Sequence, residues 1–196
     1  MKTSPTCMIV YSVLLALSMI LFVTTETMAQ EGKKFALKGS TELGGSISFQ
    51  SLTPVSDGNT GTASTIFALA PYIGYFVVDG FELGLNPFGI TSISYSGSSA
   101  TQVAIFFAPS YNFSTQSIAY PFIEGLLGFT SQSSGSSETL SGFSWGGRGG
   151  VKLAVTDKGL LILGLEYVQI TLDRSGAANR SGSNQLSVSA GFTIWF

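Results

Sequence analysis

Hydrophobic and polar residues alternate along most of the chain after residue 30, and the segment 184–196 shows this pattern without interruption. One set of alternate positions holds Leu186, Val188, Ala190, Phe192, Ile194 and Phe196, and the other holds Ser187, Ser189, Gly191, Thr193 and Trp195. A period of two residues is typical of a β-strand whose two faces meet different surroundings. The C-terminal segment is therefore predicted to be an amphipathic strand.

Similar alternation predicts eight strands in all. They are residues 34–49, 64–78, 81–93, 102–113, 120–132, 143–155, 160–172 and 184–196. For two of these strands, the pattern leaves open which set of alternate positions forms the apolar face. The segment 64–78 is apolar at both sets of positions, and in 120–132 Glu124 shares a face with Phe122 and Leu126.

The connections between these segments alternate in length. Short turns are expected at Asp79-Gly80, near 114–117 and at 156–159, and longer connections at 51–63, 94–101, 133–142 and 173–183. Asp-Gly between two strand patterns is a strong hairpin signal. An even number of strands joined alternately by short and long connections is typical of barrels in bacterial outer membranes. The predicted fold class is therefore all-β, an eight-stranded antiparallel up-and-down transmembrane β-barrel.

Composition separates this fold from a soluble barrel. The 196 residues are 44% hydrophobic and only 10% charged, with a mean hydropathy of +0.38. A lipocalin-like barrel with an apolar interior is the alternative, but its outer face would need many charges to stay soluble. The polar faces of the predicted strands carry too few charges for that, so we expect the apolar face to contact outer-membrane lipid.

Aromatic residues near strand ends are expected to form interfacial girdles: Phe35, Phe49, Phe81, Phe113, Tyr120, Phe143, Tyr167, Trp195 and Phe196.

The first 29 residues have the order of a secretory signal. Lys2 precedes an apolar run from Cys7 to Val23, and Thr27 and Ala29 stand at the −3 and −1 positions of the expected cleavage site. This order predicts a cleavable signal peptide at 1–29 and a barrel domain at 30–196. An uncleaved helical anchor is the alternative, although the run lies at the short limit for a spanning helix.

The chemistry available to the chain is narrow. It contains no histidine and a single cysteine, Cys7, which excludes histidine general bases, Ser-His nucleophiles and histidine or multi-cysteine metal sites. A net charge of −2 gives no basis for nucleic-acid binding, which calls for a basic face. We predict no catalytic residue, no cofactor and no metal, and hence no enzyme.

Charged residues in the strand patterns mostly occupy the face opposite the apolar one. We hypothesise that they form a charge network inside the barrel, because buried charges require partners. Its predicted members are Lys38, Glu42, Glu82, Glu124, Arg148, Lys152 and Glu166. Arg148 is expected at the depth of Glu166, and Lys152 at the depth of Glu124. A proton or ion path is the functional alternative, and a glycosidase-like carboxylate pair lacks any sign of a cleft.

The run 146–150, Gly-Gly-Arg-Gly-Gly, superficially suggests phosphate binding. It lacks the Lys-Ser/Thr of a P-loop and lies within a strand pattern. Its glycines are therefore expected to relieve curvature or to make room inside the barrel.

Three motifs resemble those of small outer-membrane β-barrel proteins of the OmpA, OmpX and OmpW types. Residues 71–84 look like their first periplasmic hairpin, 120–125 are similar to their fifth-strand opening, and 192–196 resemble their C-terminal assembly signal. The resemblance implies secretory export, escort by periplasmic chaperones and insertion into the bacterial outer membrane by the barrel-assembly machinery. Phe192, Ile194, Trp195 and Phe196 would be the recognised residues.

The function expected on these grounds is structural or interaction-based, with an extracellular partner bound through the loops. The alternative is a narrow channel or a binding site for small hydrophobic compounds, as the resemblance to OmpW-type barrels allows. An enzymatic role comes third, since the barrel enzymes known by family, lipid A acyltransferases and deacylases, depend on a histidine that this chain lacks.

Overall fold

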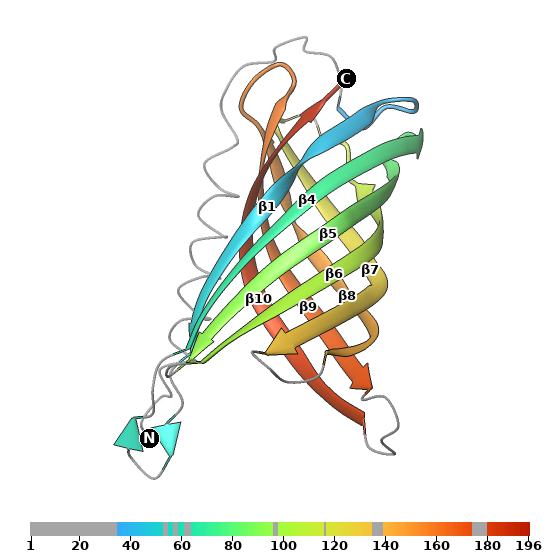
Figure 1. Ribbon diagram of the computed structural model, residues 1–196. Coiled ribbons are helices and arrows are strands. Elements are labelled where there is room, and N and C mark those ends of the chain that lie inside the picture. Colours follow the sequence, from blue (N-terminus) through green and yellow to red (C-terminus); the bar gives the residue numbers. More distant parts are fainter. Residues whose placement is uncertain are drawn as a thin grey trace, which may run out of the picture.

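The computed structural model of the chain describes residues 35–52, 55–56, 59–60, 64–95, 98–115, 117–134, 139–173 and 180–196. Within these ranges eight antiparallel strands close into one barrel, in the order β1-β10-β9-β8-β7-β6-β5-β4 (Figure 1). They are β1 (Thr41–Leu52), β4 (Ser64–Val78), β5 (Phe81–Tyr95), β6 (Ser98–Asn112), β7 (Ala119–Ser134), β8 (Leu140–Ala154), β9 (Gly159–Asp173) and β10 (Arg180–Trp195). The predicted fold class is confirmed.

The connection between β1 and β4 contains a small additional pairing, in which β2 (Val55–Ser56) lies antiparallel to β3 (Asn59–Thr60). The predicted signal peptide, residues 1–29, lies outside the described residues. No helix in the described ranges is long and apolar enough to cross a membrane.

The barrel closes because β1 pairs on both sides. Leu43 on β1 lies opposite Ile73 on β4 and opposite Ile194 on β10. Closure pairs the backbone groups that an open sheet would leave free at its two edges. In a bilayer that pairing is a requirement, because hydrocarbon offers no alternative hydrogen-bond partner.

Side chains divide between the two faces as the alternation predicts. Large apolar residues cover the outside, and they include Leu43, Ile47, Leu69, Ile73, Leu85, Val103, Ile105, Phe107, Ile123, Leu127, Leu165, Val188, Phe192 and Ile194. The two open facings are resolved, since Tyr72 and Phe76 point inward on β4 and Phe122, Glu124 and Leu126 point inward on β7. An apolar outer surface of this extent suits lipid and excludes the soluble alternative.

The first predicted strand is wrong at its start. It was expected from residue 34, but β1 begins at Thr41. The backbone turns at Ala36 (φ +66°) and Gly39 (φ +88°), and this turn carries Phe35 into the barrel mouth, where the residue is 2% exposed. Glycine in a strand pattern indicates such a bend, so Gly39 was the available signal.

The predicted aromatic girdle is correspondingly wrong at three positions. Phe35 and Trp195 are buried inside the barrel, and Tyr120 packs against them. Four predicted members are exposed on the outside: Phe113, Phe143, Tyr167 and Phe196. Phe81 is half-buried, and the side chain of Phe49 lies outside the described residues.

The glycine run on β8 makes room for the neighbouring strands. Gly146, Arg148 and Gly150 share the inward parity, and a Cβ added at Gly146 or Gly150 would overlap a carbonyl oxygen of β9. At Gly149, on the outward face, the nearest atom to an added Cβ is the Phe122 carbonyl oxygen at 3.6 Å, an ordinary contact distance. Two glycines of the run are therefore required by packing, and Gly149 is not.

This difference predicts that Gly150→Ala destabilises the barrel and Gly149→Ala does not. Overlap with the Leu163 carbonyl oxygen must push β8 and β9 apart, which we expect to lower the free energy of unfolding by about 2 kcal/mol. Urea unfolding in detergent micelles, followed by tryptophan fluorescence, measures both variants. Equal stability of the two would contradict the packing explanation.

Candidate functional site

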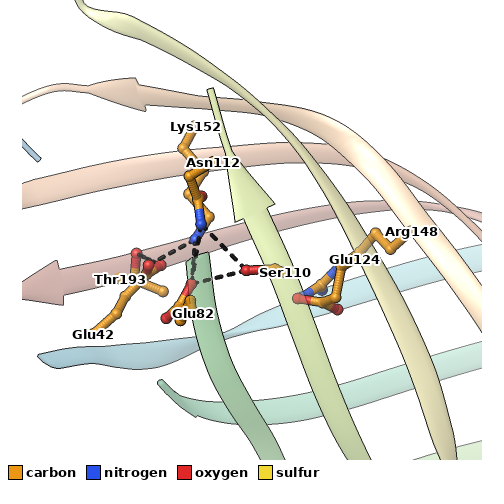
Figure 2. Close-up of polar contacts among 8 residues, drawn as sticks. All are labelled: Glu42, Glu82, Ser110, Asn112, Glu124, Arg148, Lys152 and Thr193. Atoms are coloured by element: carbon orange, nitrogen blue, oxygen red, sulfur yellow. Dashed lines mark hydrogen bonds and ion pairs between the residues drawn. The ribbon is translucent and has the colours of Figure 1, made fainter. Parts of the chain in front are cut away.

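Lys152 on β8 is buried in the lumen and contacts two carboxylates. Its Nζ lies 2.6 Å from Glu42 Oε2 on β1 and 3.4 Å from Glu82 Oε2 on β5 (Figure 2). No two of these three strands are neighbours in the closed sheet. The ammonium therefore links three separate parts of the barrel wall across the lumen.

Neutral groups complete the surroundings of both carboxylates. Thr193 Oγ1 donates to Glu42 Oε1 at 2.7 Å, while Ser110 Oγ and Asn112 Nδ2 donate to Glu82 Oε2 at 3.0 and 3.3 Å. Figure 2 shows these side chains, Ser110 and Asn112 from β6 and Thr193 from β10, converging on the two carboxylates. We call Lys152, Glu42, Glu82 and these three donors the lysine cluster. Hydrogen bonds to charged groups in a low-dielectric interior are stronger than those between neutral groups.

A second ion pair lies beside the lysine cluster. Arg148 Nη2 is 2.9 Å from Glu124 Oε1 and donates a hydrogen bond to Glu124 Oε2 at 3.0 Å. The two residues are directly opposite each other on β8 and β7. Both side chains are at least 95% buried, so water weakens the attraction between their charges only little.

Aromatic rings enclose the Lys152 ammonium on several sides. Its Nζ lies 5.3 Å from the ring centroid of Phe35, 5.5 Å from that of Phe122 and 5.8 Å from that of Tyr72. Cations are attracted to ring faces within about 6 Å, and most strongly where water is excluded. The rings thus contribute to holding the cation at this depth.

Phe35 closes the short-turn end of the lumen. Its ring makes edge-to-face contacts with Phe76, Tyr120 and Trp195 at centroid distances of 5.3, 5.1 and 6.0 Å. The segment is fixed by backbone bonds, with Gly80 N–H donating to the Ala36 carbonyl at 2.8 Å and Gly39 N–H to that of Phe76 at 2.8 Å. We call Phe35, Phe76, Tyr120 and Trp195 the aromatic plug.

The structure brings five of the predicted network residues together and leaves two apart. Glu42, Glu82, Glu124, Arg148 and Lys152 are buried in the two ion-paired groups. The prediction for Lys38 is wrong, because the turn at 38–39 directs its side chain to solvent and its backbone N–H donates to Asp79 Oδ1. Glu166 points inward but is half-buried, opposite Arg148 on the neighbouring strand.

The expected depths were only partly right. Arg148 does lie level with Glu166, but Glu124 is also opposite Arg148 and not opposite Lys152. The cross-strand neighbour of Lys152 on β7 is Tyr120, and its carboxylate partners come from across the lumen. The C-terminal motif divides by parity, with Phe192, Ile194 and Phe196 exposed outward and Trp195 buried inside.

The described residues contain no group of three or more Asp, Glu, Cys or His side chains that could hold a metal ion. The buried carboxylates are held by cations or hydroxyl donors. What this geometry supplies is mechanical: partnered charges that connect distant strands.

Replacement of Lys152 tests this mechanical role. Lys152→Met leaves Glu42 and Glu82 buried without their cation, and removing one partner of a buried pair costs about 3–5 kcal/mol of unfolding free energy. Lys158→Met, in an exposed turn, is the matched control and should change stability by at most about 0.5 kcal/mol. Urea unfolding in micelles compares them.

Adding Glu42→Gln and Glu82→Gln to Lys152→Met removes the unpaired charges as well, so part of the lost stability should return. If Lys152→Met is as stable as the Lys158 control, the lysine cluster does not hold the barrel together.

No protein-family model and no curated protein matches the sequence, but solved structures match the fold. Neisserial surface protein A aligns with a TM-score of 0.61 at 18% identity, over 81% of this chain and 98% of that one. The outer membrane protein OprG from Pseudomonas aeruginosa aligns with a TM-score of 0.54 at 15% identity, over 84% and 98%. At such identities the likeness concerns architecture. The chain has the eight-stranded barrel fold of small bacterial outer-membrane proteins.

Proposed function

We propose that this chain is an integral protein of the bacterial outer membrane, with a barrel that is closed to ions and a structural or surface-interaction role. Its apolar outer face supports residence in lipid, and the shared fold supports the outer membrane in particular. The observation that carries the closed state is the filled lumen. Eight-stranded barrels have interiors just wide enough for side chains to fill.

Two successive layers block the lumen from the short-turn end. The aromatic plug comes first, and Phe76 within it is fully buried. The lysine cluster follows, with Lys152 2% and Glu42 0% exposed. An ion crossing here would have to separate a lysine from two carboxylates and displace packed rings. This arrangement favours a structural element over a channel.

The long connections are the proposed interaction surface. They join strand ends that lie opposite the aromatic plug, since the strands alternate in direction and Thr41, where β1 begins, and Phe196 lie at the short-turn end. The Neisserial relative by fold is described as a surface protein, and we propose the same exposure here. During assembly, we propose that the barrel-assembly machinery recognises the outward residues Phe192, Ile194 and Phe196 before β10 pairs with β1.

Electrical recording tests the closed state. Purified protein in planar bilayers is expected to give no stable openings, and Phe35→Ala should also stay closed because the lysine cluster remains. A large porin recorded in parallel shows that the assay detects channels. Reproducible stepwise conductance by the unaltered protein would disprove the closed barrel and favour a conduit.

A second candidate function, handling of small apolar compounds, is favoured by a weak point in the wall. Pairing between β4 and β5 is interrupted from Leu69 to Ile73, and β5 carries an extra residue between Asn86 and Gly89 relative to β6 as well. Pro71 and Pro87 fall in this region, and proline has no N–H to donate. The wall is therefore held by fewer hydrogen bonds here.

Hollows lie on both sides of this weak point. Outside is an apolar groove of about 650 Å³ lined by residues that include Ile47, Leu69, Pro71, Phe88 and Phe192. Inside is a smaller cavity, and Ser46 and Leu69 line both. A small apolar compound from the lipid could bind in the groove and reach the lumen through the wall.

Uptake of N-phenylnaphthylamine, which fluoresces once it reaches a membrane interior, tests this candidate in intact cells. Cells producing the protein should take up the dye faster than cells without it. Ala70→Phe, which fills the inner cavity, should abolish the gain, whereas Ile73→Phe on the outward face of the same strand should not. Heat-dependent migration on SDS gels verifies that each variant folds, and equal uptake by both variants would contradict the wall path.

A further inference from the structure

The inner cavity lies in the lumen beyond the Arg148–Glu124 pair, and polar and apolar residues share its lining about equally. Its volume is about 70 Å³, and its polar lining includes Asn86, Gln102, Glu166, Gln185, Ser187 and Ser189. A cavity needs about 10–15 Å³ of free volume to hold one water molecule. This one has room for several waters or for one small organic ion.

Two deeply buried polar atoms of the lining lack a partner. Asn86 is 5% exposed and Ser189 is 4% exposed, yet Asn86 Oδ1 and Ser189 Oγ bond to no atom in the part of the chain that the structure describes. Buried polar groups are almost always hydrogen-bonded, so such exceptions call for an explanation. Both residues line the cavity, and a donor placed there would satisfy both oxygens.

The charged side chains in the lumen also favour a positively charged ligand in this cavity. Among the described residues, the inward-facing charged side chains are the carboxylates Glu42, Glu82, Glu124 and Glu166 and the cations Arg148 and Lys152. Lys152 contacts two of the carboxylates and Arg148 contacts Glu124. Within the described ranges Glu166 has no ion-pair partner within 4.0 Å, although Arg148 is its neighbour in register. The cavity therefore has an excess of negative charge.

The chemistry of the lining selects among cations. A calcium ion takes six to eight oxygen ligands, several of them carboxylate, whereas this cavity offers a single carboxylate. A primary ammonium has three donors and no acceptor, which matches one carboxylate, one amide oxygen and one hydroxyl. We propose that the cavity binds a small primary ammonium ion, paired with Glu166 and donating hydrogen bonds to Asn86 and Ser189.

Titration of the isotope-labelled full barrel in detergent micelles with ethylammonium chloride, followed by NMR, tests the site. Saturable shifts are expected at the backbone amides of Asn86, Glu166 and Ser189. Ethanol, a neutral molecule of similar size, and sodium or magnesium chloride at equal ionic strength should not reproduce them.

Glu166→Gln should weaken ethylammonium binding by at least about tenfold, and Asp157→Asn, which removes a charge from an exposed turn, should leave it unchanged. Ser189→Ala keeps the carboxylate and should weaken binding less, which covers the case in which Glu166→Gln does not fold. Non-saturable shifts, equal binding by Glu166→Gln, or equal binding of sodium or magnesium would overturn the proposal. None of these results depends on whether the barrel conducts.

Discussion

The structure depends on one constraint: in hydrocarbon, a backbone N–H or C=O group has no partner except another backbone or side-chain group. Pairing of β1 with both β4 and β10 meets this constraint by removing the sheet edges. Once the sheet is closed, every strand must present one face to lipid and one to a narrow lumen. The alternation of apolar and polar residues along the chain is the consequence, and so is the filling of the lumen by side chains from all eight strands.

A lumen filled in this way makes charges both costly and useful. Lys152 and Arg148 are almost completely buried, and each is acceptable only because carboxylates lie within ion-pair distance. Since the partners of Lys152 come from strands that are not its neighbours, the same contacts that offset desolvation also connect distant parts of the wall. The distribution is uneven, however, because the lysine cluster and the Arg148–Glu124 pair leave Glu166 facing the inner cavity without an ion-pair partner in the described ranges.

Departures from a regular barrel coincide with the places where function is proposed. The turn at Ala36 and Gly39 sends Phe35 inward and closes one end. The extra residue on β5 interrupts strand pairing between the inner cavity and the outer groove. Bulges and bends cost pairing energy and are over-represented at barrel rims and beside functional sites. The regular strands, by contrast, supply rigidity and residence in lipid.

The sequence by itself determined the eight barrel strands, apart from the start of the first, and the facing of all but two of them, because a strand's pleat and a tight turn such as Asp79-Gly80 are local properties. It also placed six charged residues in the lumen, the five of the ion-paired groups and Glu166. Only the tertiary structure decided which of them meet, since Lys152 and Glu42 are 110 residues apart and their contact depends on how the strands are staggered around the closed sheet. Phe35 and Lys38 were misplaced for a related reason. Their alternation continued that of β1, but a turn before the first strand reversed their facing, so the aromatic side chain was buried and the ammonium was left in water.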